Sequence, residues 1–93
     1  MNRTEILNAA KECICGKCEQ DYGSPENSFR QVAELWNAYL GGKIVQPVDV
    51  PLMLVLLKIA QIQTGGGTDD NYVDIAGYAA CAGEVATLGG NNE

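Results

Sequence analysis

Two aspartates in the C-terminal third of the chain, Asp70 and Asp74, are the strongest candidates for chemistry. They stand four residues apart, so on a helix they project from one face, where two like charges repel unless a cation, a proton or water relieves them. Carboxylate oxygens are also the ligands that Mg²⁺ prefers. The spacing is compatible with a magnesium or ligand site, although two acidic residues early in a helix can serve only to stabilise the helix dipole.

One cation, Lys58, interrupts the most apolar segment of the chain, VPLMLVLLKIAQIQ at residues 50–63. An unpaired charge among apolar side chains is costly, so a carboxylate or an anionic ligand is its natural partner. Two further candidates precede this segment. Asp21-Tyr22-Gly23 could supply a ring that stacks on a base, or a hydroxyl. Arg30 could meet a phosphate, but a solvated surface charge is the commoner state of such a residue.

Three of the four cysteines form the motif CICGKC at residues 13–18, and the fourth is Cys81. Together they could in principle complete a tetrahedral zinc site. Such a site normally uses two spaced pairs, however, and here the fourth ligand would come from the middle of a helix. The simpler interpretation is that the cysteines are small apolar residues, reduced in the cytosol.

Composition excludes several classes of function. The 93 residues carry a formal charge of −6 and no histidine, which rules out histidine-based catalysis and histidine metal ligation. An acidic chain is also a poor partner for DNA or RNA, because binding to a phosphate backbone needs a basic surface. The longest apolar run is about half of the ~20 residues that span a bilayer. With no secretory signal at Met1, these features predict a cytoplasmic setting without membrane insertion.

Hydrophobic periodicity predicts four helices and no strand of comparable strength. Glycines, prolines and candidate caps set the bounds of these helices. The first runs from the N-cap Thr4 to about Ile14, and the second from Pro25, after the N-cap Ser24, to Leu40. The third runs from Val50, after the N-cap Asp49, to Gln63, and the fourth from about Asp70, capped by Thr68 or Asp69, to Leu88. Residues from about 89 should form a fraying tail. We therefore expect one all-α domain over residues 1–93, with four antiparallel helices.

The helix at residues 50–63 is apolar on every side, so we expect other segments to cover it all round at the centre of the core. On the last helix, Gly77 and Cys81 continue the face of Asp70 and Asp74, and such small residues let a ligand or another helix approach closely. Another face is expected to be core; it carries Tyr72, Ile75, Ala76 and Ala79. So small a chain buries little surface, which favours a homo-oligomer.

Three segments carry a resemblance: GKCEQDYGSPENSFRQVAELWNAYL at 16–40, VDVPLMLVLLKIAQIQ at 48–63, and DDNYVDIAGYAA at 69–80. They resemble a set of small phage and prophage proteins, which is similar in turn to the MazG-like all-α nucleoside triphosphate pyrophosphatases. The resemblance implies a four-helix MazG-like bundle completed by oligomerisation to a dimer or tetramer, with a nucleotide-sized cleft. In the enzymes two acidic pairs hold Mg²⁺, which bridges the triphosphate and activates water. Asp70 and Asp74 match the later pair, whereas only Glu34 stands near the earlier one.

This resemblance leads to three hypotheses. In the first, a phage-type protein in the host cytoplasm holds a small nucleotide without turnover, plausibly a cyclic or ADP-ribose-type immune signal, and so acts as a sponge. The ligand-binding residues would be Asp21 and Tyr22 for base or sugar, Arg30 and Lys58 for phosphate, and Asp70, Asn71 and Asp74 for polar contacts or a metal.

The second hypothesis is a Mg²⁺-dependent nucleoside triphosphate pyrophosphohydrolase, in which four carboxylates would converge: Glu34, Asp70, Asp74 and Glu84. The third is a structural phage protein, whose apolar third helix and small-residue fourth helix form an assembly interface.

Overall fold

The computed structural model describes residues 1–17 and 23–88. Within these ranges the chain is helical and contains no strand, so the predicted all-α class is confirmed. The elements are α1 (Arg3–Glu12), the short π-helical turn η1 (Cys13–Lys17), α3 (Pro25–Leu40), α4 (Asp49–Gly65) and α5 (Asp69–Leu88). The tail predicted from about residue 89 lies outside the described residues. No described helix is long and apolar enough to cross a membrane.

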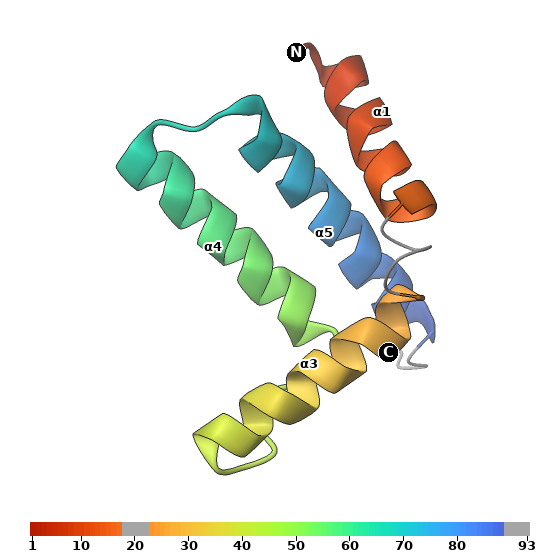
Figure 1. Ribbon diagram of the computed structural model, residues 1–93, viewed down its shortest axis with the longest axis vertical. Coiled ribbons are helices and arrows are strands. Elements are labelled where there is room, and N and C mark those ends of the chain that lie inside the picture. Colours follow the sequence, from red (N-terminus) through yellow and green to blue (C-terminus); the bar gives the residue numbers. More distant parts are fainter. Residues whose placement is uncertain (18–22, 89–93) are drawn as a thin grey trace.

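Helices α4 and α5 form an antiparallel hairpin, α1 lies beside α5, and α3 crosses the end of the hairpin at which α4 begins (Figure 1). The α-ammonium of Met1 stands 3.3 Å from the carboxylate of Asp69 at the start of α5, so α1 and α5 begin at the same end and run parallel. The prediction of four antiparallel helices is therefore correct only for α4 and α5. Helices α4 and α5 pack closely on each other, α1 packs on α5, and α3 packs on both.

Asn37 holds the segment that follows α3. Helical periodicity places this residue opposite the apolar side of its helix, where a side chain is expected to face solvent. Its side-chain oxygen accepts hydrogen bonds from the backbone N–H groups of Ile44 (2.9 Å) and Val45 (2.7 Å), and its amide donates to the carbonyl of Val45 (2.9 Å). These bonds hold the segment after Gly41 against α3. Gly41 itself has φ 82°, the left-handed conformation that ends helices at glycine. The chain thus turns back along α3 before α4 begins.

Two predicted N-caps are wrong, for local reasons. Helix α1 is capped by Asn2, not Thr4: the Asn2 side chain accepts from the N–H of Glu5 (2.8 Å), and the Glu5 carboxylate accepts from the N–H of Asn2 (2.9 Å). This reciprocal box requires an acidic or amide residue three positions after the cap, and Thr4 has Leu7 there. Asp49 is the first residue of α4, and its carboxylate accepts from the N–H of Gln46 (2.9 Å) instead of capping forward. The predicted N-cap position of Ser24 and the early Pro25 of α3 are confirmed, but the Ser24 side chain makes no capping hydrogen bond.

The core is smaller than the sequence predicts. One cluster joins α3, the following segment and α4 through Ala33, Val45 and Val50, with Phe29, Val32, Trp36 and Leu54 packed against it. A second group of buried residues, Cys81, Ala82 and Val85 on α5, and Ala10 on α1, accompanies the packing of these two helices. Two residues predicted as core, Tyr72 and Ala79, are exposed on α5.

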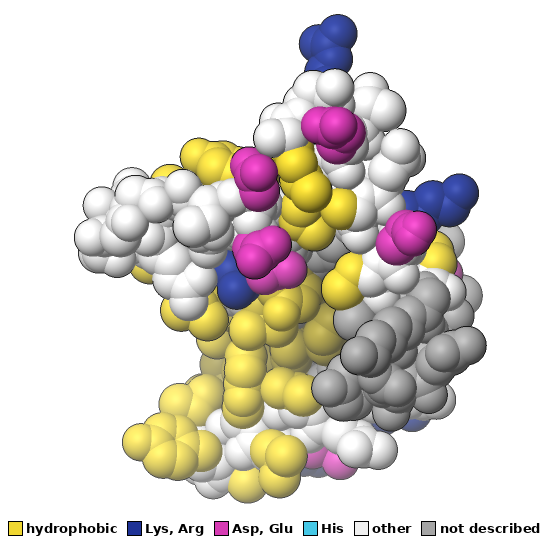
Figure 2. All heavy atoms as spheres, turned by 45° about the horizontal axis from the view of Figure 1, so that its top comes forward, with side chains coloured by type: hydrophobic (Ala, Val, Ile, Leu, Met, Phe, Trp, Pro, Cys, Tyr) yellow, Lys and Arg dark blue, Asp and Glu magenta, His cyan; other side chains and the backbone are white. Residues whose placement is uncertain are grey.

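Helix α4 is not covered all round in the single chain, contrary to the prediction. Among the described elements only α5 and α3 pack on it. One side of α4 is left uncovered by these elements, and its five large residues are between 40% and 64% exposed: Leu52, Met53, Leu56, Leu57 and Ile59. Two neighbouring helices cannot enclose a helix that is apolar on every side. Figure 2 shows one face of the molecule, on which hydrophobic side chains gather in a hollow beneath a group of acidic side chains.

Candidate functional site

Lys58 and Asp74 form an ion pair between α4 and α5, with 2.9 Å between the Lys58 Nζ and the Asp74 Oδ2. Of the two partners predicted for Lys58, a carboxylate or an anionic ligand, the structure shows the carboxylate. The side chains are 21% and 35% exposed, so the pair is partly withdrawn from water. The hydrogen bond that Lys58 donates to Asp74 raises the pKa of Lys58 above its ordinary value of 10.5. Burial of the ammonium opposes this shift, and the charges of Asp74, Tyr78 and Asp70 add smaller increases. Lys58 therefore stays positively charged, and its charge is already paired with Asp74.

The neighbours of this pair have different tasks. Asp70 is exposed and adds negative charge near Lys58. Asn71 holds the start of α5: its side-chain oxygen accepts from the backbone N–H (3.0 Å) and the hydroxyl (3.1 Å) of Thr68, and its amide donates to Gln61 at the end of α4 (2.9 Å). Asn71, predicted to contact a ligand, is thus occupied in closing the helical hairpin.

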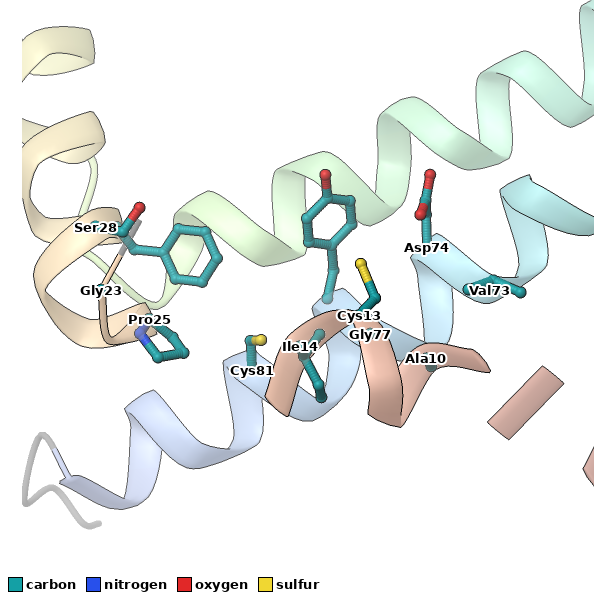
Figure 3. Close-up of a pocket in the computed structure, with 12 residues that line it drawn as sticks. Ala10, Cys13, Ile14, Gly23, Pro25, Ser28, Val73, Asp74, Gly77 and Cys81 are labelled. Atoms are coloured by element: carbon teal, nitrogen blue, oxygen red, sulfur yellow. The ribbon is translucent and has the colours of Figure 1, made fainter. Parts of the chain in front are cut away.

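A cavity of about 220 Å³ opens beside Asp74. Its walls come from α1 and η1, the start of α3, and one stripe of α5, and they consist of Ala10, Cys13, Ile14, Gly23, Pro25, Ser28, Phe29, Val73, Asp74, Gly77, Tyr78 and Cys81. Figure 3 shows Asp74 at one end and Ser28 at the other, with Cys13 and Gly77 between them. The lining is mainly apolar, with a carboxylate, two hydroxyls and two thiols as its polar groups. Such a site suits a flat, mostly apolar group with a few polar edges.

The small residues of α5 allow this arrangement. A Cβ added to the buried Gly77 would stand 3.2 Å from the Cγ2 of Ile14, so η1 approaches α5 as closely as a glycine permits. The sequence predicted that a ligand or another helix would use this face, and it is the helical segment of Ile14 that does so. Three residues at helical spacing, Val73, Gly77 and Cys81, then form the α5 side of the cavity.

The other predicted site residues are not gathered at this cavity. Arg30 and Glu34 line a separate and larger hollow, of about 760 Å³, between α3 and the following segment, which contains none of the aspartates. Glu84 is exposed on α5 and lines neither. Asp21 and Tyr22 lie outside the described residues. Over residues 1–17 and 23–88, no three Asp, Glu, Cys or His side chains come close enough to hold a metal ion, whether the predicted Mg²⁺ or zinc; Cys18 is not among the residues described.

Sequence reasoning missed most of the cavity. The sequence singles out none of four lining residues as part of a site: Ser28, Phe29, Val73 and Tyr78. Their signal in the sequence is weak, because each is typical of a half-buried helix position. Only the juxtaposition of three elements shows that they face one space.

Comparison with known proteins gives the chain its family. A family model described as "Domain of unknown function (DUF6378)" matches residues 5–86. The chain belongs to this DUF6378 family. The matched range contains every residue that lines the cavity, together with the Lys58–Asp74 pair.

Two phage proteins are similar to this DUF6378 chain. The Gene 55 protein of Mycobacterium phage L5 is 46% identical over 74 residues, which cover 80% of this chain and 47% of the relative. The Gene 55 protein of Mycobacterium phage D29 is 35% identical over 80 residues, covering 86% of this chain and 52% of the relative. The chain thus spans about half the length of these relatives. The expected likeness to phage proteins is confirmed, whereas the likeness to MazG-like enzymes stays a prediction. No solved structure matches the chain.

Proposed function

We propose that this chain is a binding protein that holds the base and sugar of a small nucleotide in the cavity between α1, α3 and α5, without turning it over. The observation that carries the proposal is the cavity itself, with its apolar walls and its carboxylate at one end. Drug-sized sites start at about 300 Å³, so a cavity of about 220 Å³ accepts a group no larger than a nucleoside and leaves the phosphates of a nucleotide outside.

The polar groups of the cavity match the edges of a nucleoside. The Asp74 carboxylate accepts hydrogen bonds, which exocyclic amino groups and ribose hydroxyls donate. The hydroxyl of Ser28 can donate or accept at the other end. The rings of Phe29 and Tyr78 also line the space, and stacking of a base on an aromatic side chain is worth about 1–3 kcal/mol.

Phosphate recognition by Lys58 requires an exchange of partners, because its ammonium is bound to Asp74. A phosphate that reached Lys58 would have to displace this carboxylate, with Asp70 adding repulsion. Arg30, the second predicted phosphate ligand, lines the other hollow. We therefore assign recognition to the base and sugar, with Lys58 as the residue that orients Asp74.

Retention without hydrolysis is supported by the distribution of carboxylates. A pyrophosphohydrolase would bring Glu34, Asp70, Asp74 and Glu84 around Mg²⁺, whose oxygen ligands lie at about 2.1 Å. Glu34 instead lines a hollow that contains no aspartate. The relatives are phage proteins. The role that we propose for a phage protein with such a cavity is sequestration of a cyclic or ADP-ribose-type immune signal in the cytoplasm of the infected host.

The test is to incubate the protein with nucleoside triphosphates, cyclic dinucleotides and ADP-ribose derivatives, with and without Mg²⁺, and then to heat-denature it and identify the released nucleotide by mass. An intact ligand that had left free solution supports sequestration. A monophosphate and pyrophosphate formed only with Mg²⁺ would establish the enzyme instead. No retention of any compound contradicts the proposal and favours a structural role.

A cavity variant locates the binding. Val73→Phe places a ring in the cavity and should reduce ligand retention at least tenfold. Ala79→Phe adds the same ring to an exposed position of the same helix and should leave retention unchanged. Equal retention by both variants would show that the ligand binds elsewhere.

A further inference from the structure

The bare side of α4 is one continuous surface, which we call the α4 face: Leu52, Met53, Leu56, Leu57 and Ile59. Leu52, Leu56 and Ile59 follow one another at helical spacing, and Met53 and Leu57 form a parallel row beside them. Leu56, in the middle, is 64% exposed. This stripe extends over two turns of the helix.

The α4 face carries no charge. Between Val50 and Gln63 the only charged residue is Lys58, and its ammonium lies against Asp74 of α5. Two copies of a chain with a net charge of −6 repel each other over most orientations. The five side chains of the α4 face bring no charge into such a contact, which makes a second copy of the same chain the partner that it fits.

The exposed area is also larger than is usual for a compact monomer of this size. The chain exposes 6,320 Å², about a fifth more than the roughly 5,200 Å² usual for a folded monomer of 9.9 kDa. Its radius of gyration is 13.9 Å, against about 12 Å for 93 residues in a compact domain. The surface excess, about 1,100 Å², is comparable to the area of roughly 800 Å² that each partner buries in a standard interface.

We propose that two copies of this chain dimerise through their α4 faces about a twofold axis, with Leu56 near the axis. A twofold contact is self-complementary, because the same residues face each other from both copies. It would supply the cover that α4 lacks in the single chain. No residue that lines the cavity lies on α4, so the dimer and the proposed ligand site are independent.

The first test compares two charge insertions at equally exposed leucines. Leu56→Glu places a charge in the α4 face, whereas Leu7→Glu, the control, changes a leucine of α1 that is 62% exposed. Sedimentation equilibrium should give the wild type and Leu7→Glu twice the mass of 9.9 kDa, and Leu56→Glu should dimerise at least 100-fold more weakly. A wild type that stays monomeric at every concentration up to about 1 mM would overturn the proposal, because its dimer would then be weaker than typical specific complexes. So would a dimer that Leu7→Glu dissociates and Leu56→Glu does not.

A second measurement keeps the test decisive if Leu56→Glu fails to fold. The melting temperature of a protein stabilised by dimerisation rises with protein concentration. The wild type should show this rise. A melting temperature that does not change with protein concentration would refute the dimer. Ligand retention by monomeric Leu56→Glu, measured as above, separates the two proposals: retained binding supports the cavity whatever the state of the dimer.

Discussion

Replacing Gly77 and Gly83 by alanine, one at a time, tests how closely η1 lies on α5. Both glycines are inside the same helix, where alanine is favoured over glycine by about 1 kcal/mol. A Cβ at Gly83 meets nothing within 4 Å. We therefore expect Gly83→Ala to raise the free energy of unfolding by about 1 kcal/mol, which is about 4–8 °C in melting temperature for a domain of this size.

Gly77→Ala has the same gain in helix propensity but meets Ile14. The new Cβ would stand 3.2 Å from the Ile14 Cγ2, inside the contact optimum of about 3.5–4.0 Å. Overpacking of this kind costs about 1–3 kcal/mol. The net effect at Gly77 is then between about 0 and 2 kcal/mol of destabilisation, and Gly77→Ala should melt below Gly83→Ala by at least about 4 °C.

The assay is thermal and urea unfolding, followed by circular dichroism at one protein concentration for both variants. Gly77 also lines the cavity, so its variant should retain less of any ligand that the wild type holds. If both alanines raise the melting temperature equally, Ile14 does not press on α5, and the walls of the cavity are not as described.

Three further predictions concern polar contacts. Because the pKa of Lys58 is raised in the folded protein, the contribution of Lys58 to stability is complete below pH 10.5 and is lost as the pH rises through the pKa of the folded state. Thermal melts should therefore show the wild type losing more stability than Lys58→Met between about pH 9 and pH 11.5. Equal losses would contradict the ion pair with Asp74. Asn37→Ala removes three hydrogen bonds and should cost about 2 kcal/mol in urea unfolding; a loss under about 0.5 kcal/mol would show that the segment after α3 is held by other contacts. Asn71→Ala should lower the unfolding free energy by about 1 kcal/mol through the lost helix start, whereas Asn8→Ala, at an exposed position of α1, should not lower it.

Local signals in the sequence were sufficient for the helices and for one contact. Ser24, Pro25 and Gly41 mark the ends of α3 because each residue suits a helix terminus by its own backbone chemistry. The pairing of Lys58 followed from the cost of an isolated charge among apolar residues. Such arguments need only neighbours along the chain or on one helix. The same kind of local argument nevertheless misplaced the N-caps of α1 and α4.

What the sequence could not supply is the direction in which helices face each other. The apolar segment of α4 looks the same on every side, so no pattern says which side stays bare. Asn37 looked like a solvent-facing residue, yet it turns towards backbone groups seven and eight residues away. The cavity is a property of three elements that are distant in sequence, and none of them carries a motif that names the others.

The attachment of α1 has a consequence for how the cavity fills. Only Ala10 of this helix is buried, and the neighbouring Ile14 supplies the contact over Gly77. Segments with so few buried side chains open at low free energy while the rest of a protein stays folded. Because α1 and η1 form one wall of the cavity, their opening is a route of entry, and a bound molecule would hold them closed. Amide hydrogen exchange in α1 should therefore slow on ligand binding far more than exchange in α4, so this helix serves as a natural reporter of occupancy.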